Sequence, residues 1–362
     1  MASRSNCSAI RARVWIGNPG GGNMKAAVLE NIKQIVVRDV PLPQPGPDEV
    51  VIKVKTCGMC GTDLKLYTGQ YTARIPVVPG HEYSGEIVET GNNVKNLKVG
   101  QKVVSDPNES CGKCYWCRNH QPCFCNDLAA YGVLRDGGFA EYCTATEKGV
   151  YPIPEGVDDE VAAFAEPVSC VVHAADRINY RAGETVVILG GGPLGQIHLQ
   201  FALNSGAGKV ILVDPNQTRR QLATKFGAQV VIDPKEGKVK EQVFDETNTL
   251  GADIVIEAVG RTETIEQAFD LAKRGGRVII FGFAPEGQKA TFIPFNVLSR
   301  ELTIMGAWVN PYSYSRALDV LSSGRIDVKP LISNRLKLDN ILDGYKMMAE
   351  KPVGFIKSLV SP

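Results

Sequence analysis

Four cysteines lie close together in one short segment of the chain. Cys111, Cys114, Cys117 and Cys125 are separated by two, two and seven residues. Four thiolates at such spacing can surround one zinc ion in a closed tetrahedral site, which leaves no position for a substrate. An iron–sulfur cluster, a redox dithiol or a nucleic-acid-binding zinc ribbon would use the same residue type. The segment is only mildly basic, which disfavours the ribbon, so the spacing predicts a structural zinc ion.

A glycine-rich turn follows an apolar run in the second half of the chain. Gly190, Gly192 and Gly195 occupy the first, third and sixth places of a G-x-G-x-x-G pattern that also contains Pro193 and Leu194. Glycine allows a tight turn and a close backbone approach to a pyrophosphate, and the free N–H groups at a helix start bind the phosphates. Glycines can also serve the turn alone. The flanking strand and helix patterns favour a dinucleotide-binding loop.

A carboxylate further along the same segment bears on which dinucleotide would bind. Asp214 follows Gly195 by nineteen residues, at the end of the next apolar run. A carboxylate there accepts hydrogen bonds from the adenosine ribose and repels a 2′-phosphate, which favours NAD over NADP. Arg219 and Arg220 lie nearby, and a guanidinium could tolerate the phosphate. Because the carboxylate is nearer to the turn, we predict NAD.

Other metal-binding residue types are scattered through the chain. Cys60 precedes Gly-Thr-Asp, His81 and Glu82 follow Gly80, and Glu166 precedes a proline. Each is weak alone, because a single histidine or cysteine is more often part of a core than a ligand. Together they fall beside turns of the first half, and a dinucleotide domain needs a group that polarises its substrate.

Composition limits the class of protein. The chain has 362 residues, 44% of them apolar, which is enough for two domains with packed cores. Forty basic against thirty-nine acidic side chains give a net charge of +1, so neither nucleic acid nor an anionic membrane is an expected partner. No apolar run approaches the length of about 18 residues that a transmembrane helix needs. We expect a small-molecule substrate and, from clustered reduced cysteines, a cytoplasmic location.

The pattern of apolar residues divides the chain into parts. Residues 1–23 contain arginines but no acid, and we interpret them as a disordered extension or a remnant of cloning, with a weak transit peptide as the alternative. Short alternating runs between prolines and glycines predict a mostly β domain over residues 24–175. Continuous apolar runs separated by helix-length segments predict a doubly wound parallel sheet over 176–311. Residues 312–362 are predicted to return to the first domain.

These motifs together resemble the zinc-dependent medium-chain dehydrogenases of the alcohol dehydrogenase superfamily, from Met24 to near the C-terminus. The resemblance implies an α/β protein with a GroES-like catalytic domain and a Rossmann domain. It implies that Cys60, His81 and Glu166 hold a catalytic zinc ion and that Glu82 lies beside that ion. The four clustered cysteines match the structural-zinc lobe of the family in all three spacings.

Within the family, the chain is similar to the polyol branch that includes sorbitol dehydrogenase. Glu166 stands where alcohol dehydrogenases carry cysteine, and Arg300-Glu301 matches a pair at the polyol pocket. The aromatic residue that polyol enzymes place six positions after the zinc cysteine is Leu66 here, with Tyr67 next to it. Threonine and butanediol dehydrogenases share much of the pattern, so the substrate stays open.

The resemblance also implies a mechanism. The zinc ion lowers the pKa of a secondary hydroxyl, hydride passes to NAD, and Thr62 begins the proton relay. Many relatives end that relay on a histidine, where this chain has Lys65, so either the pKa of Lys65 is lowered or water accepts the proton. Asp63 is expected either to orient a ligating imidazole or to cap a helix at the surface. We expect His198, in the apolar helix after the glycine turn, to pack in the core.

Two other readings change the class of protein. A zinc-free quinone or enone reductase using NADPH would share the fold, but Cys60, His81, Glu166 and Asp214 argue against it. A non-catalytic redox sensor that binds zinc and dinucleotide would not need Thr62. Family analogy predicts a homotetramer, or else a homodimer.

Overall fold

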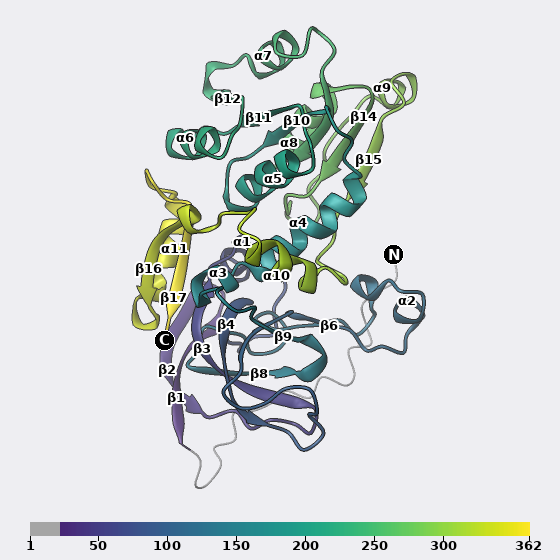
Figure 1. Cartoon of the computed structure of the whole chain (residues 1–362). Coiled ribbons are helices and arrows are strands. Elements are labelled where there is room, and N and C mark those ends of the chain that lie inside the picture. Colours follow the sequence, from purple (N-terminus) through teal and green to yellow (C-terminus); the bar gives the residue numbers. More distant parts are fainter. Residues whose placement is uncertain (1–21) are drawn as a thin grey trace. The chain divides into compact units, whose positions relative to one another are not determined.

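The computed structural model describes residues 22–362. It contains two compact units (Figure 1). Unit 1 comprises the described residues up to Ile153 together with 336–342 and 360–362, and unit 2 comprises 154–335 and 343–359. The predicted extension, residues 1–23, lies outside the described residues except for its last two, and β1 begins at Asn23. The predicted domain boundaries after residues 175 and 311 stay predictions.

Unit 1 is built mainly of strands. Its strands and its two short α-helices are β1 (Asn23–Asn31), β2 (Gln34–Pro41), β3 (Glu49–Gly58), α1 (Gly61–Tyr67), β4 (Glu82–Thr90), β5 (Lys102–Ser105), β6 (Asn108–Glu109), α2 (Tyr115–Arg118), β7 (Ala129–Ala130), β8 (Tyr142–Thr146) and β9 (Val150–Pro152). β1 and β2 form a hairpin, which the Pro-rich segment after Val40 ends. The larger sheet also contains β16 (Ile332–Lys337) and β17 (Lys357–Ser361) and has the order β16-β17-β3-β4-β5-β9, and β8 also pairs with β3. The predicted mostly β character of this part is confirmed.

One excursion from unit 1 is closed by its own small ladder. β6 pairs antiparallel with β7, with Asn108 opposite Ala130 and Glu109 opposite Ala129. All four clustered cysteines lie in the segment between these strands, residues 110–128, which we call the four-cysteine lobe. The β6–β7 pair is therefore the stem of the lobe.

Unit 2 contains a six-stranded parallel sheet in the order β12-β11-β10-β13-β14-β15. Its elements are α3 (Asp159–Ala162), α4 (Ala165–Ile178), β10 (Thr185–Leu189), α5 (Pro193–Asn204), β11 (Lys209–Val213), α6 (Gln217–Lys225), β12 (Val230–Ile232), α7 (Val239–Asp245), β13 (Ala252–Glu257), α8 (Thr262–Leu271), β14 (Ala272–Ile280), α9 (Pro294–Ser299), β15 (Thr303–Gly306) and α10 (Tyr314–Ser322). β16 (Ile332–Lys337), α11 (Ile341–Glu350) and β17 (Lys357–Ser361) are divided between the two units. The predicted doubly wound sheet is confirmed.

The inner strands of this sheet are buried on both faces, as their sequences require. Successive side chains of a strand point to opposite faces. Val187 and Leu189 of β10 join a core with side chains of α7 and α8, whereas Val186 and Ile188 join a second core with side chains of α5. Every side chain of such a strand must then be apolar, which explains the continuous runs without alternation.

Within residues 22–362, no helix has both the length and the apolar character that crossing a membrane requires.

Candidate functional site

The four-cysteine lobe brings its thiols together. The Sγ atoms of Cys111, Cys114, Cys117 and Cys125 all lie within 4.8 Å of one another, and individual pairs are 3.5, 3.9 and 4.0 Å apart. Sulfurs about 2.3 Å from a central zinc ion form a tetrahedron with edges of about 3.8 Å. The donor set therefore fits a zinc ion, and its closed geometry suits a structural one.

Backbone N–H groups in the lobe favour thiolate at one of these positions. The amides of Cys117 and Asn126 donate toward the Cys114 sulfur and lower the pKa of that thiol to about 6. Burial acts in the opposite direction on Cys125 and raises the pKa of its thiol to about 12. Negative charge in the lobe is therefore best accommodated at Cys114, where the turn presents its amides.

A second group forms where two neighbouring strands meet turns. β3 ends at Gly58, two residues before Cys60, and Gly58 is paired with Glu82 at the start of β4. This register places Cys60, His81 and Glu82 together, and one ligand atom from each lies within 4.8 Å of the others. His81 and Glu82 are buried and Cys60 is half-buried. The thiolate, imidazole and carboxylate donors suit zinc.

Asp63 organises this group from behind. It is fully buried, and it lies in the first turn of α1, for which Cys60 is the N-cap residue. Its Oδ2 accepts a hydrogen bond from the Cys60 amide at 2.7 Å, and its Oδ1 lies 3.5 Å from Nδ1 of His81. Contact with Nδ1 leaves Nε2 of the imidazole for an ion. Burial disfavours the imidazolium, but the Asp63 carboxylate outweighs it and raises the pKa of His81.

The sequence left the role of Asp63 open between orienting an imidazole and capping an exposed helix. The side chain does take part in a capping box, but it is buried and also touches the histidine. The sequence could not predict that the Asp63 side chain is buried, because the helix pattern alone does not show which side of α1 faces β4.

The predicted site residues Thr62 and Glu166 lie in the first turns of two different helices, α1 and α4. Thr62 is in the first turn of α1, and its Oγ1 lies 3.8 Å from Sγ of Cys60. Glu166 belongs to unit 2, in the first turn of α4, where the Cys170 thiol donates to its Oε1 at 3.4 Å. The relay role of Thr62 and the ligation by Glu166 stay predictions.

The glycine turn joins β10 to α5 in unit 2. Gly190 has a left-handed backbone with φ of 101°, and a Cβ atom at Gly195 would lie 1.8 Å from the Gly190 carbonyl oxygen. Gly192 is the N-cap residue of α5 and Pro193 its first residue, followed by Leu194. The first glycine thus makes the turn and the third lets the helix pack on it, while the helix start presents free amides.

The carboxylate predicted for the ribose reaches back to this turn. Oδ2 of Asp214 accepts a hydrogen bond from the Gly191 amide at 2.7 Å, and Oδ1 accepts one from the Asn216 amide at 2.7 Å. Nη1 of Arg219 lies 3.7 Å from the same Oδ2, and both side chains are largely buried. The carboxylate is therefore fixed against the turn, with a guanidinium next to it.

A buried carboxylate that the sequence analysis did not single out lies at the end of β13. Oε1 of Glu257 accepts hydrogen bonds from the amides of Val259 and Gly260, each at 2.9 Å, and from the Thr264 hydroxyl at 2.7 Å. A Cβ atom at Gly190 would lie 2.7 Å from the Val259 side chain. Glu257 thus fixes the turn that packs beside the glycine loop. An acid that ends an apolar run, Ile254-Val-Ile-Glu257, was the available signal.

The pair predicted to contact substrate has backbone partners in unit 2. The guanidinium of Arg300 donates to the carbonyls of Phe269, at 3.0 Å, and Ala272, at the end of α8. It also lines a hollow of about 290 Å³ beside α8 and α9. Glu301 follows in a left-handed conformation with φ of 48°. Their contact with substrate stays a prediction.

Comparison with known proteins identifies the two halves separately. Residues 46–155 match the family described as alcohol dehydrogenase GroES-like domain, and residues 193–323 match the one described as zinc-binding dehydrogenase. The GroES-like match covers β3 to β9 with the four-cysteine lobe but not β1 and β2, and the second match begins at the start of α5.

Relatives match over most of the chain. It is 34% identical to D-arabinitol dehydrogenase 1 of Uromyces fabae, over 88% of this chain and 91% of the relative. It is 33% identical to sorbitol dehydrogenase of Bacillus subtilis strain 168 (94% and 98% covered), and 36% identical to L-threonine 3-dehydrogenase of Pyrococcus horikoshii (87% and 92%). A solved structure from Sinorhizobium meliloti 1021, described as a zinc-binding dehydrogenase bound to NADP, is 40% identical with a TM-score of 0.90 and covers 94% of this chain and 100% of its own. The chain belongs to the zinc-dependent medium-chain dehydrogenases of the alcohol dehydrogenase superfamily.

Proposed function

We propose that this protein oxidises a secondary hydroxyl of a polyol and transfers the hydride to NAD, with zinc at the reacting centre. The Cys60–His81–Glu82 group, backed by Asp63, is the observation that carries the proposal. The names of its D-arabinitol and sorbitol dehydrogenase relatives support a polyol as the substrate class.

Cys60, His81 and Glu166 would hold the catalytic ion, and Cys111, Cys114, Cys117 and Cys125 the structural one. A zinc ion with three protein ligands and one open position acts as a Lewis acid that lowers the pKa of an alcohol. Glu82 would stand beside the ion without being one of its three regular ligands. Asp63 keeps the imidazole of His81 and the Cys60 backbone in place.

Deprotonation of a hydroxyl requires a path for the proton. The Thr62 hydroxyl lies 3.8 Å from Sγ of Cys60 and can both accept and donate a hydrogen bond. We propose that it takes the proton from the substrate and passes it toward solvent. Arg300 and Glu301 are proposed to contact the remaining hydroxyls.

The glycine turn and Asp214 would hold the dinucleotide, with Gly190, Gly192, Pro193, Leu194 and Gly195 around the pyrophosphate. The position of Asp214 beside the Gly191 amide supports NAD. Arg219, 3.7 Å from that carboxylate, is the group that a 2′-phosphate would meet, and the Sinorhizobium meliloti relative is described with NADP. The test must therefore compare both cofactors.

A substrate panel tests this proposal. Sorbitol, xylitol, galactitol, D-arabinitol, L-threonine, 2,3-butanediol and ethanol are incubated with NAD or NADP, with zinc supplied or chelated, and formation of the reduced dinucleotide is followed by absorbance. We expect one polyol to be oxidised with NAD and chelation to abolish turnover. If only threonine or butanediol is oxidised, the proposed polyol substrate is wrong, but the proposed zinc-dependent hydride transfer still holds. A separate assay offers an enone with NADPH after zinc has been chelated. Turnover there would show that the protein is a zinc-free reductase and not a zinc-dependent alcohol dehydrogenase.

The setting of the enzyme is also proposed. The clustering of four cysteines in a set that suits zinc supports a reducing compartment such as the cytoplasm. Kinship with the family supports a homotetramer, with a homodimer as the alternative, and light scattering of the purified protein would decide between them.

A further inference from the structure

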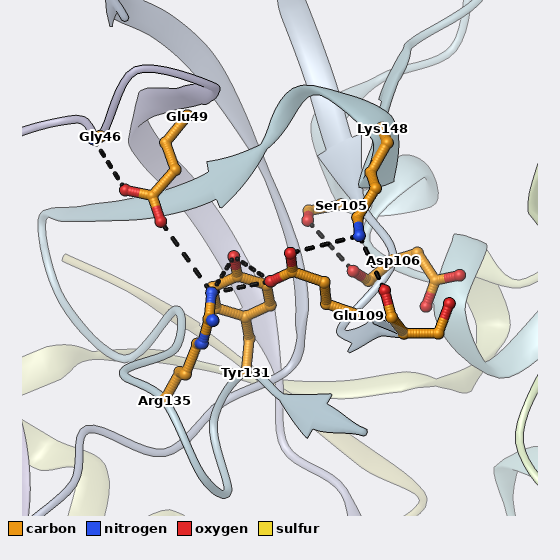
Figure 2. A network of polar contacts seen from close by, with 9 residues as sticks. Gly46, Glu49, Ser105, Asp106, Glu109, Tyr131, Arg135 and Lys148 are labelled. Atoms are coloured by element: carbon orange, nitrogen blue, oxygen red, sulfur yellow. Dashed lines mark hydrogen bonds and ion pairs between the residues drawn. The ribbon is translucent and has the colours of Figure 1, made fainter. Parts of the chain in front are cut away.

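The stem of the four-cysteine lobe is held by side chains from other segments of unit 1 (Figure 2). Glu109 ends β6 two residues before Cys111, and its side chain is mostly covered. Nη1 of Arg135 donates to its Oε2 at 2.7 Å, the Tyr131 hydroxyl donates to the same oxygen at 3.3 Å, and Nζ of Lys148 lies 3.4 Å from its Oε1. We call these four residues, Glu109, Tyr131, Arg135 and Lys148, the stem network.

The same network reaches the first residue of the lobe and the start of β3. Nζ of Lys148 donates to the carbonyl oxygen of Ser110 at 2.8 Å. Oε1 of Glu49 lies 3.9 Å from Nη1 of Arg135 on the other side (Figure 2). Burial raises the pKa of Tyr131, so its hydroxyl keeps its proton at neutral pH and remains a donor. Contacts to the Glu109 side chain and to the Ser110 carbonyl therefore fix both the position and the direction of the backbone where it enters the lobe.

The turn that carries Tyr131 and Arg135 also packs against the backbone next to His81. Cβ atoms at Gly132 and Gly137 would lie only 2.7 and 2.0 Å from the Gly80 carbonyl oxygen. The backbone amide of Gly138, in the same turn, donates a hydrogen bond to the Gly80 carbonyl oxygen at 2.7 Å. Backbone therefore lies directly on backbone, and a displacement of the turn must displace Gly80.

We propose that Arg135 is a positioning residue that couples the four-cysteine lobe to the Cys60–His81 metal group. Its guanidinium donates a hydrogen bond to Glu109 at the stem. The turn that carries Arg135 packs against Gly80, the residue before His81. A preorganised set of ligands loses less conformational entropy when it binds an ion, so the stem network raises metal retention in the lobe and aligns the histidine. This inference rests on the proposed zinc sites but not on the proposed substrate.

The first experiment measures metal retention in the full-length zinc-loaded protein. A chromophoric chelator competes for zinc, and pulsed alkylation with mass spectrometry reports which cysteines become accessible. We expect Arg135→Met to speed alkylation of the lobe cysteines about tenfold, since it removes a charged hydrogen bond at the stem. Arg38→Met is the matched control, because Arg38 is equally exposed and pairs with Glu30 at 3.1 Å on the β1–β2 hairpin. An equal effect in both variants would overturn the proposal.

The second experiment tests the coupling itself. Cys114→Ser weakens the lobe site, and alkylation of Cys60 reports the other group. We expect Cys114→Ser to speed Cys60 alkylation several-fold when Arg135 is present and to add nothing in the Arg135→Met background. A Cys60 rate that ignores Cys114→Ser, or responds to it equally in both backgrounds, would refute the coupling.

Two checks keep the outcome interpretable. Arg135→Lys serves if Arg135→Met should fail to fold, since lysine keeps the positive charge but lacks the planar guanidinium. We expect the lobe cysteines of Arg135→Lys to be alkylated at a rate between those of wild type and Arg135→Met. A wild-type rate would contradict the proposed role of Arg135. If Cys60 in the unaltered protein were not protected by metal, both the proposed function and the coupling would fall. Protection without polyol turnover would refute the proposed substrate alone.

Discussion

At the scale of residues, one carboxylate serves two ligand-bearing segments. Asp63 accepts hydrogen bonds from the amides of Cys60 and Gly80, at 2.7 and 3.3 Å, and touches His81. These segments are twenty residues apart in the chain, so the carboxylate fixes their separation as well as the tilt of the imidazole. Its negative charge also stabilises the ring when the ring shares its lone pair with an ion.

We therefore expect Asp63→Asn to weaken zinc retention at the Cys60–His81 group by about 10- to 100-fold, while the lobe retains its ion. The amide is similar in size but lacks the charge and one acceptor. Chelator competition with pulsed alkylation of Cys60 measures this. Asp39→Asn on β2, where the carboxylate is exposed, serves as the control. Equal retention in both variants would assign Asp63 to helix capping alone.

His198 provides a pH-dependent prediction. It is fully buried in α5, its ring packs edge-on against Phe281 at 4.5 Å, and neither ring nitrogen has a hydrogen-bond partner among the described residues. Burial lowers the pKa of His198 from 6.5 to about 3. The unfolded chain therefore binds a proton that the folded chain does not, and the free energy of unfolding falls as the pH drops from 6.5 toward 3.

We expect His198→Leu to remove this loss. Between neutral pH and about pH 5, wild type should lose about 2 kcal/mol more unfolding free energy than the variant. Urea denaturation at the two pH values measures the difference. Parallel losses in the two proteins would show that His198 is protonated in the folded state.

At the scale of elements, the glycine turn separates two duties that the motif combines. Gly195 permits contact with the Gly190 carbonyl, where a Cβ atom would lie at 1.8 Å, whereas a Cβ at Gly192 meets nothing closer than 4.0 Å. We expect Gly195→Ala to lower the free energy of unfolding by about 1–3 kcal/mol. Gly192→Ala should leave stability nearly unchanged and weaken NADH binding, because the added Cβ would occupy the place proposed for the pyrophosphate. Thermal unfolding and NADH fluorescence titration distinguish them, and equal stability losses would contradict the division.

The elements also show how far the sequence could be interpreted. Continuous apolar runs predicted β10, β11, β13, β14 and β15. The inner strands β10, β11 and β13 are buried on both faces and therefore need such runs, whereas the edge strand β15 is largely exposed. β12 and β8 were not predicted; β12 has only three residues and β8 has one face half-exposed. The spacing of the four cysteines predicted their cluster, since all lie in one loop. The burial of Asp63 and the role of Glu257 depend on contacts between distant segments, which no local pattern contains.

At the scale of the whole molecule, two units with separate cores should respond to different ligands. Both metal-binding groups found among the described residues lie in unit 1, and the glycine turn lies in unit 2. The four ligands of the lobe all lie in unit 1, so we expect Cys114→Ser, which weakens that site alone, to lower the unfolding temperature of one calorimetric transition. NADH at about 100 times its Kd should stabilise the other by about 2.7 kcal/mol. One transition that both treatments move equally would show that the units unfold as one.

Unit 1 is not continuous along the chain, and this affects its synthesis. Unit 2 is largely made by residue 335, but residues 336–342 and 360–362 belong to unit 1. In the order β16-β17-β3, the place beside β3 is taken by β17 (Lys357–Ser361), which leaves the ribosome long after β3 and β4. Until then the nascent chain carries an open strand edge, which other nascent chains can pair with. Ribosome stalling before residue 357 should therefore produce aggregation-prone chains in which the β10–β15 sheet is complete but the edge of β3 is still open.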